Sequence, residues 1–189
     1  MKKIIFTITL VLTTLTLMAQ EHLSFKGIPI TGTMTEFCQK LKAKGLKSLG
    51  YESRTAVFSG DFTGREATIG AVAANDGKNV LGVVVLFNPS NEWNTLEDTY
   101  NHYKALYTHK YGEPSLSQEN NPAHSDSNTA LMGAVHDGRV TYESTWEVAG
   151  GEIILSIEKS SGFYEGMVRI LYRDSQNVET QMQHNLDEI

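Results

Sequence analysis

The stretch VLGVVVLF, from Val80 to Phe87, decides the fold of this chain. In an extended strand its side chains alternate between two faces, and both faces are apolar. Such a strand suits the centre of a sheet that is covered on both sides, or a contact between two copies of the chain. The stretch therefore predicts a strand and leaves these two settings open.

Further strands are expected around this one. Thr55–Phe62 and Arg65–Ala73 lead up to it through a Thr-Gly turn and an Asn-Asp-Gly turn. A second group of three strands is expected over Thr141–Val148, Glu152–Glu158 and Met167–Tyr172, again with glycine between the strands. Each group is typical of an antiparallel meander.

One helix is expected before each group of strands. The first begins at Thr33, which has the capping-box spacing to Glu36, and it ends at Gly45. The second begins at Asn94 and ends before Pro114.

The other segments are less regular. Ser115–Ser127 is rich in Ser, Asn, Glu and Pro and is expected to be an exposed loop, whereas Asn128–Val135 is expected to add one short helix. After Asp174 the apolar residues recur three or four positions apart, which fits either a docked helix or a fraying tail.

The order of one helix and three strands occurs twice. Residues 61–66 and 147–152 each form a glycine turn between two strands, at a spacing of roughly 86 residues. The sequence therefore predicts an α+β fold from a tandem αβββ duplication, with an antiparallel sheet packed by two main helices. The expected repeat units span about 23–90 and 91–173. Chance similarity between two glycine hairpins is the alternative.

Residues 1–19 are expected to be a secretory signal peptide, followed by a single domain over residues 20–189. Lys2 and Lys3 precede the apolar run Ile4–Met18, and Ala19 is a small residue suited to cleavage. The run is diluted by threonines and is shorter than the about 20 residues that span a membrane, so cleavage is favoured over anchoring. No cysteine follows to accept a lipid. The mature chain is therefore expected in the periplasm or outside the cell, without membrane insertion after cleavage.

Charge and cysteine content limit the partners and the stabilising bonds. The chain has 16 basic and 22 acidic residues, a net charge of −6, and removal of Lys2 and Lys3 leaves 14 basic residues and a net charge near −8. This acidic balance argues against nucleic acid and anionic membrane surfaces as partners. Cys38 is the only cysteine, which excludes an intramolecular disulfide.

Motifs for catalysis, cofactors and metals are missing. The sequence has no G-x-S-x-G, no H-E-x-x-H, no P-loop and no G-x-G-x-x-G after a strand. His102 and His109 lie seven positions apart, about 10 Å along a helix, which is too far for one metal ion. Cys38 shares its helix face with apolar residues, which favours a packed thiol over a nucleophile. No catalytic residue, cofactor or metal site is predicted.

Aromatic residues supply the candidate binding site. Tyrosines form a stripe along the second helix, a tryptophan precedes it, and two aromatic residues lie on one strand. Such rings either line a groove for a peptide, a sugar or another protein, or form the core between helix and sheet. The candidate residues are Trp93, Tyr100, Tyr103, Tyr107, Tyr142 and Trp146.

Two motifs carry a resemblance. The mature chain opens with LSFKGIPITGT at Leu23–Thr33, followed by Phe37 and KAKG at 42–45, and the second helix ends in KYGEP at 110–114. In these features it resembles a group of small uncharacterised exported proteins from Bacteroidetes, which implies export and no known active site. In fold alone it is loosely similar to the beta-lactamase inhibitor protein, a tandem repeat of helices and antiparallel sheet. That fold has two helices per unit and disulfides, whereas this chain has one clear helix in its first half and one cysteine.

The expected function is an exported, non-catalytic binding module of the cell envelope or secreted fraction, with a protein, peptide or glycan as ligand. The alternative is a small hydrolase with a dispersed site, built from His136, Asp137 and Ser125 or Ser144. His136 and Gly138 are also typical of the C-terminal end of a helix, where positive charge and glycine are both favoured.

Overall fold

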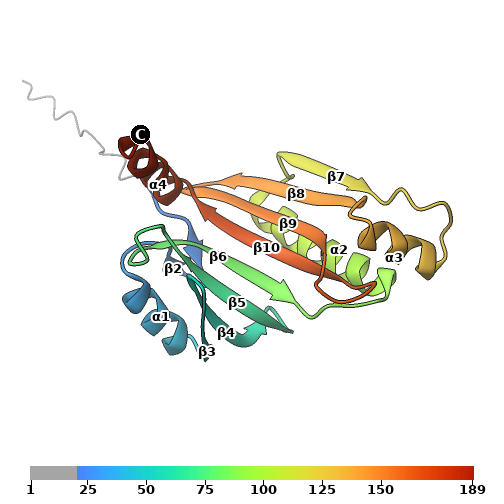
Figure 1. Cartoon of the computed structure of the whole chain (residues 1–189), viewed down its shortest axis with the longest axis horizontal. Coiled ribbons are helices and arrows are strands. Elements are labelled where there is room, and N and C mark those ends of the chain that lie inside the picture. Colours follow the sequence, from blue (N-terminus) through green and yellow to red (C-terminus); the bar gives the residue numbers. More distant parts are fainter. Residues whose placement is uncertain (1–20) are drawn as a thin grey trace, which may run out of the picture.

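The computed structural model describes residues 21–189 as an α+β fold, and the predicted signal peptide lies outside these residues (Figure 1). A small hairpin joins β1 (Ser24–Phe25) and β2 (Ile28–Pro29). The helices are α1 (Met34–Ala43), α2 (Trp93–Tyr111), α3 (Asn128–His136) and α4 (Ser175–Asp187). The strands of the large sheet are β3 (Lys47–Glu52), β4 (Thr55–Phe62), β5 (Arg65–Ala73), β6 (Val80–Phe87), β7 (Leu116–Asn120), β8 (Thr141–Val148), β9 (Gly151–Lys159) and β10 (Gly166–Asp174). No helix within residues 21–189 is both long and apolar enough to cross a membrane.

The large sheet is antiparallel throughout and has the order β3-β4-β5-β6-β10-β9-β8-β7. The last strands of the two halves therefore pair at its centre, where Val84 lies opposite Leu171 and Val85 opposite Ile170. The stretch Val80–Phe87 forms the central strand β6, as its apolar character predicts.

Each half contributes four strands to the sheet, so the predicted αβββ unit is one strand short. The strands that the sequence did not predict are β3 and β7, which form the two edges of the sheet. Every residue of both strands is exposed, so neither shows the apolar alternation that marks a half-buried strand. The predicted loop Ser115–Ser127 is wrong at its start, because β7 pairs with β8 there.

The three inner strands of the two halves correspond at a constant spacing. Strands β4, β5 and β6 begin at Thr55, Arg65 and Val80, and β8, β9 and β10 each begin 86 residues later. The pairing follows the same shift, since Ala56 lies opposite Ala71 and Tyr142 opposite Ile157. These relations support the predicted duplication, which stays a prediction.

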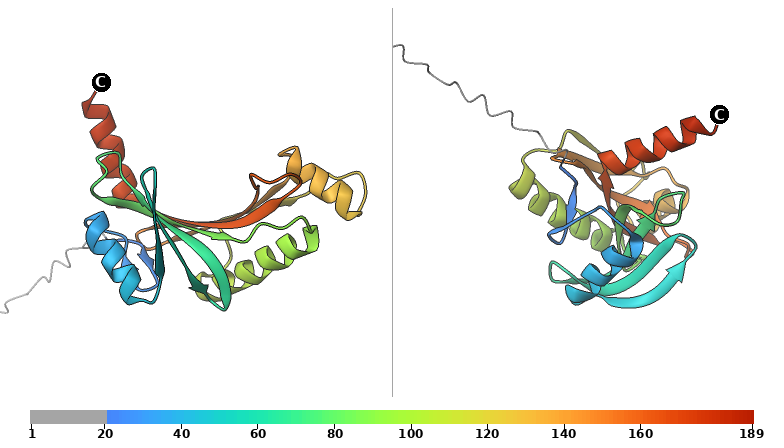
Figure 2. Two further views of the ribbon diagram at one scale, coloured as in Figure 1. Left: turned by 60° about the horizontal axis from the view of Figure 1, so that its bottom comes forward. Right: turned by 90° about the vertical axis from the view of Figure 1, so that its left-hand side faces the viewer.

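The helices leave one face of the sheet open. Figure 2 shows α1 and α2 on the same side of the sheet, and α3 and α4 at its two ends. The covered face carries the core, in which Val83, Val85 and Ile170 have no exposed surface. The opposite face carries Val84 and Leu171, which are half-buried. The first setting expected for Val80–Phe87, a strand covered on both sides, is therefore only half met, because the helices of the chain cover one side of β6.

The helix ends follow the expected local rules with one exception. Thr33 and Glu36 form the predicted capping box of α1. Helix α2 begins at Trp93, one residue earlier than expected, and Glu92 provides no side-chain cap. The side chain of Asn128, the first residue of α3, accepts the Trp93 N–H at 2.8 Å instead. A contact across 35 residues thus replaces a local cap.

Candidate functional site

The candidate aromatic residues lie between α2 and the sheet. Tyr100 and Tyr103 are 0% and 1% exposed, and Trp93, Tyr107 and Trp146 are also buried. Tyr142, on the same side of β8, is half-buried. This placement favours the second interpretation of the stripe, a helix packed on a sheet, because rings with so little exposed surface do not line an open groove.

Five of the six candidate rings have polar ends that are hydrogen-bonded within the protein, namely those of Tyr100, Tyr103, Tyr107, Tyr142 and Trp146. Tyr100 Oη lies 2.7 Å from Ser144 Oγ, and Trp146 Nε1 donates to the Gly112 carbonyl at 3.0 Å. Tyr142 donates to Glu97 at 2.9 Å, and burial, together with this carboxylate, raises the pKa of Tyr142 to about 12. These hydrogen bonds hold α2 in one orientation against the sheet.

The uncovered side of the sheet, which we call the open face, carries a row of apolar and small residues. The strand pairing places these residues opposite one another across seven strands. In order from β4 to β7 the row consists of Val57, Gly70, Val84, Leu171, Ile154, Thr145 and Leu116. With strands about 4.8 Å apart, this central row is about 29 Å long. Sequence periodicity alone could not reveal it, because the row runs across the strands.

Charged residues flank the central row. Arg173 is paired with Glu152, and Arg169 lies 2.6 Å from Glu158. Arg169 Nε is buried and has no hydrogen-bond partner among the described residues. A buried donor without a partner costs about 1–3 kcal/mol, which an acceptor from a bound molecule would recover.

Carboxylates outnumber positive charges on the open face. Glu143 and Glu147 on β8 form no ion pair within residues 21–189. Asp61 and Glu66 lie opposite each other at the β4–β5 turn. The open face therefore presents an apolar row, and the charged residues around this row are net negative.

Exposed apolar side chains also lie toward both ends of the sheet. Phe163 in the β9–β10 connection is 81% exposed, and Met182 on α4 is 61% exposed. Met182 lines a groove of about 790 Å³ between α4 and the β8–β9 turn, together with Glu147 and Arg173 from the open face. The groove extends the open face along α4.

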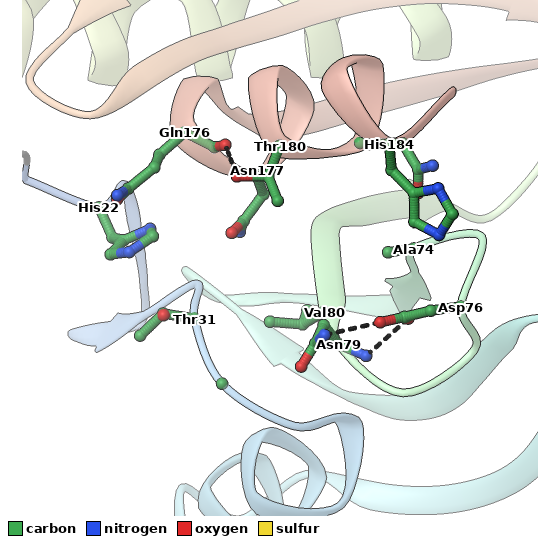
Figure 3. Close-up of a pocket in the computed structure, with 12 residues that line it drawn as sticks. His22, Thr31, Ala74, Asp76, Asn79, Val80, Gln176, Asn177, Thr180 and His184 are labelled. Carbon is green, nitrogen blue, oxygen red and sulfur yellow. Dashed lines mark hydrogen bonds between the residues drawn. The ribbon is translucent and has the colours of Figure 1, made fainter. Parts of the chain in front are cut away.

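A second, polar pocket of about 280 Å³ lies on another side of α4 (Figure 3). Its walls come from the segment before α1, the β5–β6 loop and α4. They include His22, Thr31, Asp76, Asn79, Gln176, Asn177, Thr180 and His184.

Most groups in this pocket are engaged with the protein itself. Asp76 accepts the backbone N–H groups of Lys78 and Asn79, and these bonds hold its pKa below the usual range. Gln176 Oε1 is buried without a partner among the described residues. The pocket offers hydrogen bonds but no cluster of metal ligands, since residues 21–189 contain no group of three His, Cys, Asp or Glu side chains placed to hold an ion.

The residues of the hydrolase alternative have other partners. The His136 ring stacks on Tyr164, with centroids 4.7 Å apart. The Ser144 hydroxyl forms a hydrogen bond with the Tyr100 hydroxyl, and the Ser125 hydroxyl forms one with the Ser127 hydroxyl. The described residues thus show no hydrogen bond from either serine to His136.

Cys38 lies on the buried face of α1, as its neighbours predict, and is 7% exposed. Its Sγ atom lies 3.7 Å from Tyr51 Oη, and this contact raises the pKa of Tyr51.

Comparison of the chain with protein-family models, curated proteins and solved structures gives no match.

Proposed function

We propose that this chain is an exported, non-catalytic binding module and that its open face binds a basic protein segment with apolar side chains. The observation that carries the proposal is the central apolar row on a face of net negative charge. Half-buried valine, leucine and isoleucine side chains on a sheet face gain free energy when a partner covers them. The unpaired carboxylates Glu143 and Glu147 favour positive charge in that partner.

Two features favour a protein or peptide over a glycan. The central row contains no aromatic ring against which a sugar ring would pack. Its length of about 29 Å suits an extended segment or a loop more than a small molecule.

The acidic face also argues against a second copy of the chain as the occupant. Two identical acidic faces would bring like charges together, and this costs binding free energy. Export rests on the signal-peptide pattern of the sequence, and it would place the partner in the periplasm or outside the cell.

Site-specific photocrosslinking tests the proposal in the native envelope and secreted fractions. A photoreactive residue at Leu86, on the open face, should capture a basic protein, whereas the same residue at Glu113, beyond the end of α2, should not. The captured protein is then purified and its affinity for the mature chain is measured.

Charge and apolar variants of the open face then identify the surface. The double variant Glu143→Lys/Glu147→Lys should weaken the affinity by about tenfold, and Ile154→Ser by a similar factor. Glu113→Lys, the same type of substitution at a single position away from the open face, should leave the affinity unchanged. Equal affinity of all variants, or crosslinking at Leu86 only to a second copy of the chain, would overturn the proposal.

A further inference from the structure

A cavity lies on the covered side of the sheet, and no residue of the central row of the open face lines it. It has a volume of about 310 Å³ and lies between α2, the β1–β2 turn and the β4–β5 turn. Its lining includes Phe62, Leu106, Tyr107, Tyr172, Lys26 and Lys110. This volume is at the lower end of the range for small-molecule sites, and an apolar wall with a few polar groups is typical of them.

The two lysines give the cavity a positive charge in an acidic chain. Lys26 and Lys110 form no ion pair within residues 21–189, and no carboxylate lines the cavity. The Lys26 ammonium lies 5.7 Å from the centre of the Phe62 ring and donates to the Asp61 carbonyl at 2.9 Å. The chain as a whole has more acidic than basic residues, so a local pair of ammonium groups without carboxylate partners is unusual in it. Two such groups at one cavity attract an anionic ligand.

A pair of buried hydroxyl groups supplies a second, independent indication. Tyr107 and Tyr172 are 7% and 6% exposed, and their hydroxyl oxygens lie 2.6 Å apart. Each hydroxyl has one hydrogen, and only one hydrogen can lie between the two oxygens. One O–H therefore remains for which residues 21–189 provide no acceptor.

This remaining hydrogen stays on its oxygen. Burial raises the pKa of both tyrosines far above the usual range, so both are neutral donors at physiological pH. A buried donor without an acceptor is costly, and an anionic oxygen is the acceptor that it binds most strongly.

We infer that this cavity is a binding site for a small amphipathic carboxylate, with an acyl chain or an aromatic ring as its apolar part. The apolar part would pack on Phe62 and Leu106. The carboxylate would accept hydrogen bonds from the free tyrosine hydroxyl and from the two lysine side chains. The site is separate from the open face and does not depend on the function proposed for that face.

Titration of the purified mature chain with octanoate tests the site, with octanol as the neutral probe. Calorimetry should give saturable octanoate binding and at least tenfold weaker octanol binding. Amide NMR signals of Thr63, Gly64 and Lys110 should shift with octanoate, whereas those of Val84 and Leu171 on the open face should not.

Three variants locate the carboxylate. Lys26→Gln/Lys110→Gln should weaken octanoate binding by about tenfold and leave octanol binding unchanged. Tyr107→Phe/Tyr172→Phe removes both hydroxyls of the pair and should weaken octanoate binding severalfold. Lys40→Gln/Lys42→Gln, on the exposed side of α1, is the matched control for loss of two surface charges.

The far-ultraviolet circular dichroism spectrum and the unfolding midpoint show whether each variant is folded. The inference is overturned if octanoate does not bind the wild-type chain, or if it binds the folded Lys26→Gln/Lys110→Gln variant as tightly as the Lys40→Gln/Lys42→Gln control. Equal binding of octanoate and octanol would likewise show an adventitious apolar cavity only.

Discussion

Asp174 illustrates how much one buried residue connects. It has no exposed surface, and its carboxylate accepts the N–H groups of Leu23 and Asn177 at 2.7 and 2.9 Å. The His22 ring lies 3.1 Å from the same carboxylate. The residue thus joins the segment after the predicted signal peptide, the end of β10 and the start of α4.

Replacement of Asp174 by alanine should lower the free energy of unfolding by about 3 kcal/mol. The variant loses the cap of α4 and leaves the buried Leu23 N–H without an acceptor. Urea unfolding measures the change, with Asp187→Ala at the exposed end of α4 as control. A loss below about 0.5 kcal/mol would contradict this role of the carboxylate.

The buried tyrosines predict a loss of stability at alkaline pH. Burial raises the pKa values of Tyr100, Tyr107 and Tyr172 in the folded chain, whereas unfolded tyrosine titrates near 10. Above pH 10 the unfolded chain releases protons that the folded chain keeps, so stability is full below pH 10 and falls as the pH rises. The slope is about 1.4 kcal/mol per pH unit for each such tyrosine.

Urea unfolding between pH 8 and 12 checks this, with tyrosinate absorbance as a second measurement. In Tyr142→Phe the fall between pH 10 and 12 should be less steep, because the half-buried Tyr142 contributes to it with its pKa of about 12. A midpoint that stays constant up to pH 12 would show that these hydroxyls ionise equally in both states.

Among the elements, α1 and α4 attach in opposite ways. Met34, Phe37, Cys38 and Leu41 of α1 are buried, and the predicted capping box starts the helix. Helix α4 has no buried residue. Its contacts near the β5–β6 loop are polar, such as the bond from the Asn75 N–H to Gln181.

Removal of most of α4 should therefore lower the free energy of unfolding only slightly. A chain that ends at Val178 keeps the Asp174 cap and should lose less than about 1 kcal/mol of unfolding free energy. Thr33→Ala, which removes the cap of the buried α1, should cost about 1 kcal/mol by itself. Chemical unfolding measures both, and a loss above about 2 kcal/mol on truncation would show that α4 belongs to the core.

At the scale of the whole molecule, the centre of the sheet joins the two halves. Strand β6 is apolar on both sides and pairs with β10, and a single buried cluster contains residues from both halves. Neither half therefore has a complete core, and each ends in a strand that needs a partner.

The two half chains, 21–90 and 91–189, should not fold as monomers. Each should self-associate through its free strand, β6 or β10, and a mixture should form a one-to-one complex with the spectrum of the intact chain. Size-exclusion chromatography with light scattering and circular dichroism measure this. Cooperative unfolding of either half as a monomer would contradict the prediction.

Local pattern determined much of this fold from the sequence alone. The inner strands, α1 and the α+β class were predicted because side chains that alternate in polarity, capping residues and glycine turns act within a few residues. The acidic charge and the single cysteine also follow directly from the sequence.

Only the tertiary structure decided which side of Val80–Phe87 is covered, where the edge strands lie and that the aromatic stripe of α2 is buried. Strand pairing and helix packing join residues far apart in the chain, and an apolar side chain does not specify its neighbour. The central row of the open face and the hydroxyl pair of Tyr107 and Tyr172 exist only through such long-range contacts. The sequence could name their residues but could not bring them together.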